Sequence, residues 1–498
     1  MAGTPTFDLL IVGGGINGAG IARDAAGRGL KVLLVEKDDL AAHTSSASTK
    51  LIHGGLRYLE QLEFRLVRAS LVERERLWGI APHIIHPLDF IVPQAGATRP
   101  AWLVRLGLLL YDHLGGRKRL PATRTLDLAT DQRGNGLKNR AGKAFAYADC
   151  FVDDSRLVIL NALDAAERGA RIATRTELVR AERGTDMWQA TLLGVHGQEQ
   201  VAARVLVNAA GPWVTDLLRR IHVESRRNIR LVKGSHIVLP RLYAGEHAFL
   251  IQNPDRRVIF AIPFERDFTL VGTTDSFWDA EPGIPMIDEP EVGYLLDAVH
   301  RTFAASVGRE DIVWTYSGIR PLFDDGSSNA ARVTRDYSLD VDMHGPPVVS
   351  IFGGKLTTYR RLAEQVLHRL HSMFPSAGEP WTASAPLPGG DLPLGGAVAL
   401  LDELRSEFPG IPAALLDRLV RAYGTRARQI LSAGELGTIV AGDLTEGEVR
   451  YLVEHEWAQT TEDILFRRTK LGVHLPATAA PRLEEALKTM NRGSIHAA

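Results

Sequence analysis

The N-terminal segment Asp8–Glu36 constrains the fold more than any other part of the sequence. It contains an apolar strand, a glycine-rich turn, an alanine-rich helix and a second apolar strand, Lys31–Val35. Apolar runs without alternation are typical of parallel strands that are covered on both faces. The turn, Gly13–Gly18, reads G-x-G-x-x-G with a strand before it and a helix after it, which is the context that a dinucleotide-binding motif requires. The sequence therefore predicts an α/β protein that opens with a βαβ unit.

The chemistry of this turn predicts contacts to a dinucleotide. Glycines allow the backbone to approach a pyrophosphate, whose charge is met by the N–H groups at the helix N-terminus. An acidic side chain at the end of the second strand, here Glu36, can accept hydrogen bonds from the adenosine ribose. The contacts expected from this segment are Gly13, Gly14, Gly15, Ile16, Asn17, Gly18, Glu36 and Lys37.

Later segments favour FAD over NAD. A Ser/Thr cluster follows Glu36, and it either contacts the pyrophosphate and the flavin edge or forms a helix cap or polar loop. The segment Asn208–Trp213 resembles the second dinucleotide motif of glutathione-reductase-type flavoproteins. Gly353–Thr358 resembles the late FAD motif, whose helix N-terminus faces the flavin and stabilises charge on its reduced form. The contacts expected from these segments are Thr44, Ser45, Ser46, Ser48, Lys50, Ala210, Gly211, Trp213, Gly353, Gly354, Lys355, Leu356, Thr357 and Thr358.

The composition narrows the class of protein. A chain of 498 residues exceeds the roughly 250–300 residues at which single cores stop growing, so two or three domains are expected. The formal charge of −1 argues against a nucleic-acid partner. A single cysteine, Cys150, offers no disulfide and no thiol cluster for a metal, so we expect a cytoplasmic protein without a metal site. With no secretory signal and no apolar run of roughly 18 residues, any membrane contact should be peripheral or monotopic.

The order of segments predicts three parts. Short strand-like runs from about 229 to 275 alternate with turn residues, as in an antiparallel sheet that covers a substrate. The strand Val348–Phe352 and the glycines after it return to the style of the first domain. We therefore predict an FAD-binding domain within 1–382, mainly 1–80, 150–225 and 330–382; an interleaved substrate-covering domain at about 81–149 and 226–329; a Pro/Gly-rich linker at 383–397; and a C-terminal helical domain at 398–498.

Several separated motifs carry a family resemblance. They are Leu51–Glu60, Lys233–His236, Gly272–Asp275, Tyr316–Pro321 and Gly353–Arg360, followed by Tyr451–Trp457 and Arg467–Gly472 in the helical domain. Together they resemble the FAD-dependent glycerol-3-phosphate dehydrogenases, close to the bacterial aerobic respiratory type, within the D-amino-acid-oxidase-like flavoproteins. The resemblance implies a glutathione-reductase-type, Rossmann-like FAD domain with an antiparallel-sheet substrate domain. It also implies oxidation of sn-glycerol 3-phosphate to dihydroxyacetone phosphate and transfer of the electrons to a membrane quinone.

Such a reaction needs a phosphate clamp that also positions the substrate, because reacting atoms must approach within about 3–3.5 Å. Arg57, Arg320 and Arg335 are the candidates, since a guanidinium meets a phosphate bidentately and stays charged. A surface salt bridge is the alternative for Arg320, and a local ion pair with Asp336 is the alternative for Arg335. Lys355 polarises the flavin or the substrate oxygen, or is simply a cation at a helix start.

Removal of the hydroxyl proton points to a histidine, because histidine titrates near neutral pH. His53 and His236 are both candidates, and the sequence does not rank them. Tyr58 and Thr274 either hydrogen-bond the substrate or pack. The motif around His53 also adds His53, Gly54 and Gly55 to the expected cofactor contacts, and Arg320 of the motif Tyr316–Pro321 is expected among them as well.

One apolar segment of the sequence bears on the electron acceptor. Between Arg99 and Arg119, apolar side chains recur at roughly helical spacing: Trp102, Leu103, Leu106, Leu109 and Leu110. Such a segment suits an interfacial helix on anionic lipid at the inner face of the cytoplasmic membrane, or a core helix with solvated ends. The sequence also leaves a homodimer open. The rival functions are an oxidase that uses O₂, an amino-acid oxidase, and a flavin-binding or sensing protein without turnover.

Overall fold

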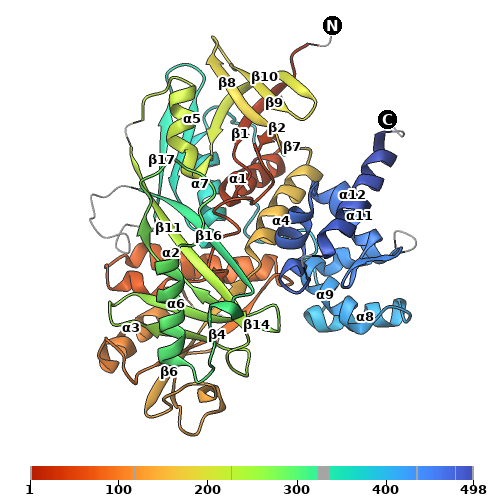
Figure 1. Cartoon of the computed structure of the whole chain (residues 1–498). Helices are drawn as coiled ribbons and strands as arrows, with labels where there is room; N and C mark the ends of the chain where they lie inside the picture. The colour runs from red at the N-terminus through yellow and green to blue at the C-terminus, as the bar shows by residue number, and fades with distance from the viewer. Residues whose placement is uncertain are drawn as a thin grey trace.

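The computed structural model describes residues 3–116, 119–225, 227–323, 336–432, 436–476 and 478–495. In this part of the chain two large β-sheets lie one above the other, and a helical domain with a small two-stranded sheet packs beside them (Figure 1). The chain is therefore an α/β protein with mixed sheets and a C-terminal helical domain, as predicted. The helices are α1 Ile16–Gly27, α2 Phe64–Ile80, α3 Ala101–Leu114, α4 Asp154–Glu167, α5 Val214–Arg220, α6 Glu289–Thr302, α7 Tyr359–Arg369, α8 Gly396–Glu407, α9 Ala413–Tyr423, α10 Ala427–Ser432, α11 Glu446–Glu456 and α12 Ala479–Ile495.

The first sheet is built around parallel strands from separated segments. Its path runs β17-β18-β10-β1-β2-β7, and the β8–β9 hairpin extends from β10. The strands from β18 to β7 pair in parallel, whereas β17 and β9 pair antiparallel with their neighbours. The bounds are β1 Thr6–Val12, β2 Val32–Val35, β7 Arg171–Ala173, β8 Glu177–Arg183, β9 Trp188–Gly194, β10 Gly197–Asn208, β17 Tyr337–Asp342 and β18 Val348–Gly353.

Apolar layers cover both faces of this sheet, which explains the unalternating strands. Helix α1 packs against both α4 and α7, and these helices share a buried cluster with Leu9 and Ile11 of β1. Leu10 points the other way and joins a second cluster with Trp188 and residues of α5. Successive side chains of a strand alternate between faces, so a strand buried on both sides must be apolar throughout.

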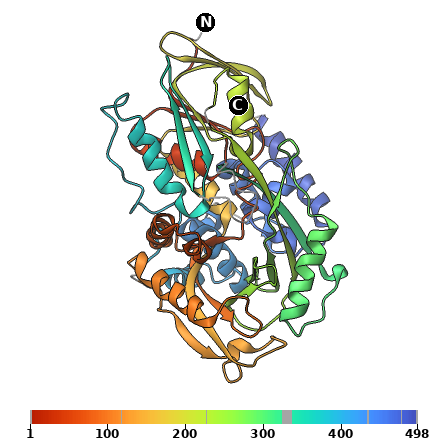
Figure 2. The ribbon, with the colours of Figure 1, turned by 90° about the vertical axis from the view of Figure 1, so that its left-hand side faces the viewer.

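The second sheet is almost wholly antiparallel. Its path runs β15-β11-β14-β13-β12-β4-β6-β3, with β16 beside β11 and β5 beside β6, and only β12 and β4 pair in parallel. Helix α6 packs on one face, and α2 and α3 contribute to the core on the other. Figure 2 shows these elements at the opposite end of the molecule from the β8–β9 hairpin. The bounds are β3 Leu51–Ile52, β4 Ile85–Pro93, β5 Arg124–Asp127, β6 Lys143–Val152, β11 Ile229–Pro240, β12 Ala248–Gln252, β13 Val258–Phe264, β14 Phe268–Gly272, β15 Ser276–Phe277 and β16 Trp314–Phe323.

Helices α8 to α12 form the C-terminal domain, drawn in blue beside α4 in Figure 1. The small hairpin of β19 (Ile439–Ala441) and β20 (Leu444–Thr445) joins them. Leu416 and Leu419, whose spacing predicts a helix, are buried in the core of this domain. In the described residues no helix combines the length and the apolar character that crossing a membrane requires.

Candidate active site

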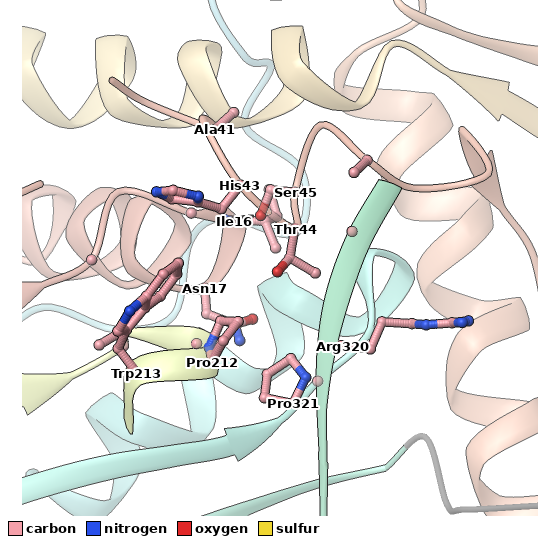
Figure 3. Close-up of a pocket in the computed structure, with 18 of the residues that line it drawn as sticks. Ile16, Asn17, Ala41, His43, Thr44, Ser45, Pro212, Trp213, Arg320 and Pro321 are labelled. Atoms are coloured by element: carbon pink, nitrogen blue, oxygen red, sulfur yellow. Dashed lines mark hydrogen bonds between the residues drawn. The ribbon is translucent and has the colours of Figure 1, made fainter. Parts of the chain in front are cut away.

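A cavity with a volume of about 350 Å³ lies at the carboxyl ends of the parallel strands. The residues that directly follow β1, β2, β10 and β18 all line it: Gly13, Glu36, Ala209 and Gly354. Ligands of open α/β sheets bind at this end of the strands. The cavity is elongated, because Trp213 and His43 lie at one side of it and Arg320 lies at the other (Figure 3).

The glycine turn between β1 and α1 brings the chain close to this cavity. Gly13 has a φ of +116°, which favours glycine, and a Cβ on Gly18 would lie 1.9 Å from the carbonyl oxygen of Gly13. The N-terminus of α1, the positive end of its dipole, faces the cavity through Ile16. Of the predicted contacts here, Gly13, Gly15, Ile16 and Asn17 line the cavity, whereas Gly14 and Gly18 lie outside its lining and shape the turn.

Glu36 lies where the sequence predicts a ribose-binding carboxylate. Its oxygens accept the N–H of Gly14 at 2.6 Å and the N–H of Asp38 at 2.9 Å, and burial raises its pKa above the usual value. Glu36, Asp38 and His43 also place potential metal-ligand atoms within 4.8 Å of one another. His43 Nε2 already contacts Asp38 Oδ2 at 2.7 Å, so this cluster is internally paired.

The Ser/Thr-rich loop after Glu36 runs along the cavity, but its hydroxyl groups form hydrogen bonds with other groups of the protein. Ser45 Oγ accepts the N–H of Ile16 at 3.0 Å, and Thr44 Oγ1 donates to a backbone carbonyl of β16 at 2.6 Å. Ser48 Oγ donates to Asp154 at 2.7 Å. Thr44, Ser45 and Ser48 therefore line the cavity while their hydroxyls fix the loop.

Two predicted cofactor contacts in this loop lie outside the cavity wall. Lys50 is fully buried, and its Nζ donates to Asp154 Oδ1 at 2.7 Å and to the carbonyl of Ser46 at 3.1 Å. Ser46 Oγ donates to the carbonyl of His43 at 3.3 Å. The position of Lys50 has a simple cause: a buried ammonium needs a carboxylate, and Asp154 at the start of α4 supplies it.

The segment after β10 covers one side of the cavity. The predicted cofactor contacts Ala210, Gly211 and Trp213 line it. The Trp213 ring packs against the His43 ring in a tilted arrangement at a centroid distance of 4.7 Å, and Lys37 Nζ lies 3.8 Å from the centroid of Trp213. Lys37 thus places a cation beside the aromatic wall.

The turn after β18 presents Lys355 to the cavity. Gly353 and Gly354 have φ values of +79° and +119°, so both need the freedom of glycine. Lys355 Nζ donates to the carbonyl of His53 at 2.6 Å and lies 5.3 Å from the Tyr58 ring centroid. Gly353, Gly354, Lys355 and Leu356 line the cavity, whereas Thr357 and Thr358 are buried outside its lining.

A pair of arginines shares one carboxylate at the far end. Arg320 donates to Asp275 Oδ1 at 2.7 Å and to the carbonyl of Thr274 at 3.1 Å, and Arg57 lies 3.6 Å from Asp275 Oδ2. The sequence motif Gly272–Asp275 contains this aspartate, but local pattern assigned it no role. Two guanidinium groups on one buried carboxylate leave a net positive charge, which suits a phosphate.

A second cavity with a volume of about 400 Å³ adjoins the first at this point. His53, Tyr58, Thr273 and Arg320 line both cavities, and Arg57 and Gly55 line the second. The far end of the second cavity is apolar and reaches α3, whose Leu103, Leu106 and Leu110 are 40%, 46% and 41% exposed. The second cavity therefore joins a cationic end to an apolar surface.

The two candidate histidines differ in their surroundings. His236 Nε2 is 3.1 Å from Thr49 Oγ1, and its ring stacks on Tyr316. Among the described residues none hydrogen-bonds the His53 ring, which lines both cavities. Burial, then the charge of Lys355, lowers the pKa of His53 well below its usual value, and burial does the same to His236. Both rings are therefore neutral at neutral pH.

The remaining predicted site residues lie behind the cavity walls or outside the described residues. Thr274 is 2% exposed, because its hydroxyl donates to Glu291 at 2.7 Å and accepts the N–H of Ser235 at 2.9 Å; its neighbour Thr273 faces the cavities instead. The N–H of Gly54 donates to a buried tyrosine hydroxyl at 2.7 Å, so Gly54 supports the wall from behind. Arg335 lies outside the described residues.

Known protein families and individual known proteins match this chain over nearly its whole length. A family model described as FAD-dependent oxidoreductase matches residues 8–360, and one described as C-terminal domain of alpha-glycerophosphate oxidase matches residues 381–493. D-erythritol 1-phosphate dehydrogenase of Brucella abortus is 52% identical over 95% of this chain and 96% of its own. Glycerol-3-phosphate dehydrogenase of Pseudomonas aeruginosa is 48% identical over 99% and 97%. The structure of glycerol-3-phosphate dehydrogenase from Bacillus halodurans complexed with FAD is 26% identical, with a TM-score of 0.77 over 98% of this chain and 90% of that chain.

Proposed function

The chain belongs to the FAD-dependent oxidoreductase family, and we propose that it oxidises sn-glycerol 3-phosphate to dihydroxyacetone phosphate. FAD is the cofactor, and when bound it would supply the hydride acceptor for the oxidation at C2 of the substrate. The single observation that carries the substrate proposal is the Arg57–Arg320 pair, which lies where the two cavities meet. A phosphate held there places the rest of a small polyol at the wall formed by His53 and Lys355.

The residues present fit FAD. The dinucleotide would lie along the first cavity, with its pyrophosphate at the N-terminus of α1 and its ribose at Glu36. The backbone of the glycine turn lies close to the start of α1, because any side chain at Gly18 would collide with the carbonyl oxygen of Gly13. The isoalloxazine end would face Gly354 and Lys355, which start the turn before α7.

The arginine pair is the proposed phosphate clamp. Asp275 holds Arg320 at 2.7 Å and Arg57 at 3.6 Å, so the two guanidinium groups converge before a ligand arrives. Gly234 leaves the space for this arrangement, since a Cβ there would lie 2.5 Å from Arg320 Nη2. Preorganised donors reduce the ordering cost of binding.

His53 is the proposed acceptor of the hydroxyl proton. Its ring is neutral and faces both cavities, whereas His236 is engaged with Thr49 and Tyr316. The cations Lys355, Arg74 and Arg57 lower the pKa of His53. A bound phosphate dianion would offset the charge of Arg57, which raises the basicity of His53 when substrate is present.

A second candidate substrate is D-erythritol 1-phosphate, because the relative that carries this substrate in its name is 52% identical over almost the full length. Both compounds combine a phosphate monoester with a secondary alcohol, so the same clamp and the same proton acceptor serve either. The open space beyond the clamp, in the second cavity, would accommodate the longer polyol.

The proposed electron acceptor is a membrane quinone that enters the second cavity from the lipid. The apolar end of that cavity is formed partly by Leu62 and Phe64, which are 74% and 40% exposed, and partly by α3. Trp102 and Leu109 extend the same apolar surface with exposures of 69% and 48%. Arg105 is an exposed cation on α3 itself, as expected at anionic lipid, whereas Arg99 is paired with Glu60. This surface would place the enzyme on the inner face of the cytoplasmic membrane.

An anaerobic titration tests the reaction. Glycerol 3-phosphate or D-erythritol 1-phosphate is added to the yellow holoenzyme, the flavin band near ~450 nm is followed, and a quinone analogue or O₂ is then supplied. We expect bleaching by substrate and rapid recovery with quinone. Faster bleaching by the erythritol ester would assign that substrate, fast recovery with O₂ would indicate an oxidase, and no bleaching with either ester would refute both substrate proposals.

The membrane proposal predicts a specific loss of vesicle binding. Leu109→Glu removes one apolar side chain and adds a charge outside both cavities, so we expect binding to vesicles with anionic lipid to weaken about tenfold or more. Co-sedimentation measures it. Val195→Glu, at an exposed position in the β9–β10 turn, is the control. Equal binding of the two variants would place the membrane contact elsewhere.

A further inference from the structure

The loop of residues 37–50 forms one wall of the dinucleotide cavity, and its outer side faces the C-terminal domain. Nine of its residues line the cavity: Lys37, Ala41, Ala42, His43, Thr44, Ser45, Ala47, Ser48 and Thr49. Behind the start of the loop lies a short π-helix of the C-terminal domain, Asp463–Arg468. Short π-helical segments occur frequently at functional sites.

Asp39 anchors the loop to this π-helix. Its carboxylate is 2% exposed and accepts from Arg467 Nε at 2.7 Å and from Arg468 Nη2 at 2.8 Å. Both arginines are themselves buried, and Arg468 also donates to the carbonyl of Glu456. A buried carboxylate requires compensating charge, and here the C-terminal domain supplies it.

The anchor is directly connected to the cavity wall. Two residues beyond Asp39, the N–H of Ala41 donates to the carbonyl of Gly14 at 3.1 Å, in the phosphate-binding turn. Arg175 links the π-helix to the same part of the loop: its side chain donates to Asp463 at 2.8 Å, while its backbone N–H donates to the carbonyl of Asp38 at 2.8 Å. The position of the π-helix therefore fixes the backbone from Asp38 to Ala41.

The far end of the loop is held through α4. Asp154 accepts from Ser48 and from Lys50, and the neighbouring Ser155 hydroxyl is hydrogen-bonded to Lys470. Lys470 is 2% exposed and lies two residues after the end of the π-helix, at 3.3 Å from Asp153. The C-terminal domain thus contacts the supports of both ends of the same loop.

We propose that the C-terminal helical domain retains FAD, and that Arg467 and Arg468 act as positioning residues which hold Asp39 and keep the 37–50 loop against the dinucleotide. Loss of these contacts leaves Asp39 with Arg175, at 4.0 Å, as its remaining cation, so most of the compensation is lost and the loop moves outward toward water. The cavity wall moves with it, and bound FAD loses part of its enclosure.

The test is the rate at which FAD leaves the purified holoenzyme, followed by the fluorescence of released flavin after dilution. Arg468→Gln is expected to accelerate release about 5–150-fold, the usual range of coupling between two sites. If Arg468→Gln does not fold, Arg467→Gln keeps the Arg468–Asp39 pair and should give a smaller acceleration.

The control separates positioning from general stability. Arg418 is held inside the C-terminal domain by Asp443 at 2.9 Å and Glu448 at 2.7 Å, away from the loop. Arg418→Gln should lower the unfolding temperature without changing the release rate. Release at the wild-type rate from both π-helix variants, or equal acceleration by Arg418→Gln, would overturn the proposal.

Coupling is reciprocal, so FAD should in turn stabilise the docking of the C-terminal domain. Hydrogen exchange of the π-helix and of α11 should slow when FAD is added to partly depleted protein. Unchanged exchange in both segments would also overturn the proposal.

Discussion

Arg320→Ala is expected to raise the KM for glycerol 3-phosphate by about 30-fold or more while FAD stays bound. Truncation of one partner in a buried, hydrogen-bonded charge pair costs about 2–5 kcal/mol, and each 1.4 kcal/mol is tenfold. The loss is enlarged by Asp275, which is left with only Arg57 from the pair and lies next to the incoming phosphate. Steady-state kinetics give the KM, and the visible spectrum reports the bound flavin.

Two further variants identify the origin of that loss. Adding Asp275→Asn to Arg320→Ala removes the negative charge of Asp275 and should recover part of the affinity. Arg309→Ala, which breaks an exposed ion pair with Glu289, should leave the KM unchanged. An unchanged KM in Arg320→Ala would remove this residue from the clamp and would leave Arg57 as the clamp candidate in the described part of the chain.

His53→Gln is expected to lower kcat by about 10²–10⁴-fold, the usual contribution of a positioned general base, with a much smaller change in KM. Glutamine keeps a polar group near the cavities but does not accept a proton. His236→Gln is the matched comparison, and its smaller expected effect reflects the engagement of His236 with Thr49. A larger loss of kcat in His236→Gln would reverse the assignment.

The pH dependence gives an independent check. Burial, Lys355, Arg74 and Arg57 all disfavour the protonated form of His53, so its pKa in the free enzyme lies well below 6.5. The neutral, proton-accepting form therefore persists as the pH falls through 6.5 and is lost only at lower pH. In the substrate complex the phosphate opposes Arg57, so the acid limb of kcat should lie at higher pH than the free-enzyme value, and His53→Gln should abolish it.

Local pattern predicted the framework of the protein. The βαβ start, the glycine turn and Glu36 depend on residues close in sequence, and the structure has them as predicted. The turns Ala210–Trp213 and Gly353–Leu356 could also be recognised from the sequence, because each follows an apolar strand. Parallel strands bring these turns to one edge wherever they lie in the chain.

Side-chain direction could not be predicted in the same way. Lys50 and Thr274 belong to the predicted set, yet buried carboxylates turn both away from the cavities. Asp154 lies 104 residues from Lys50, so no local pattern reveals the pairing. Asp275 is the opposite case, since its motif was found but its role depends on arginines from two other elements.

The sequence by itself therefore determined the fold class, the dinucleotide turn and the chemical types gathered at the site, because hydrophobic period and glycine conformation act over a few residues. The tertiary structure decided which of those groups face the cavities and which support them. It also joined Asp39 to Arg467 across 428 residues, because a buried charge is satisfied by whatever partner the packed domains bring near it.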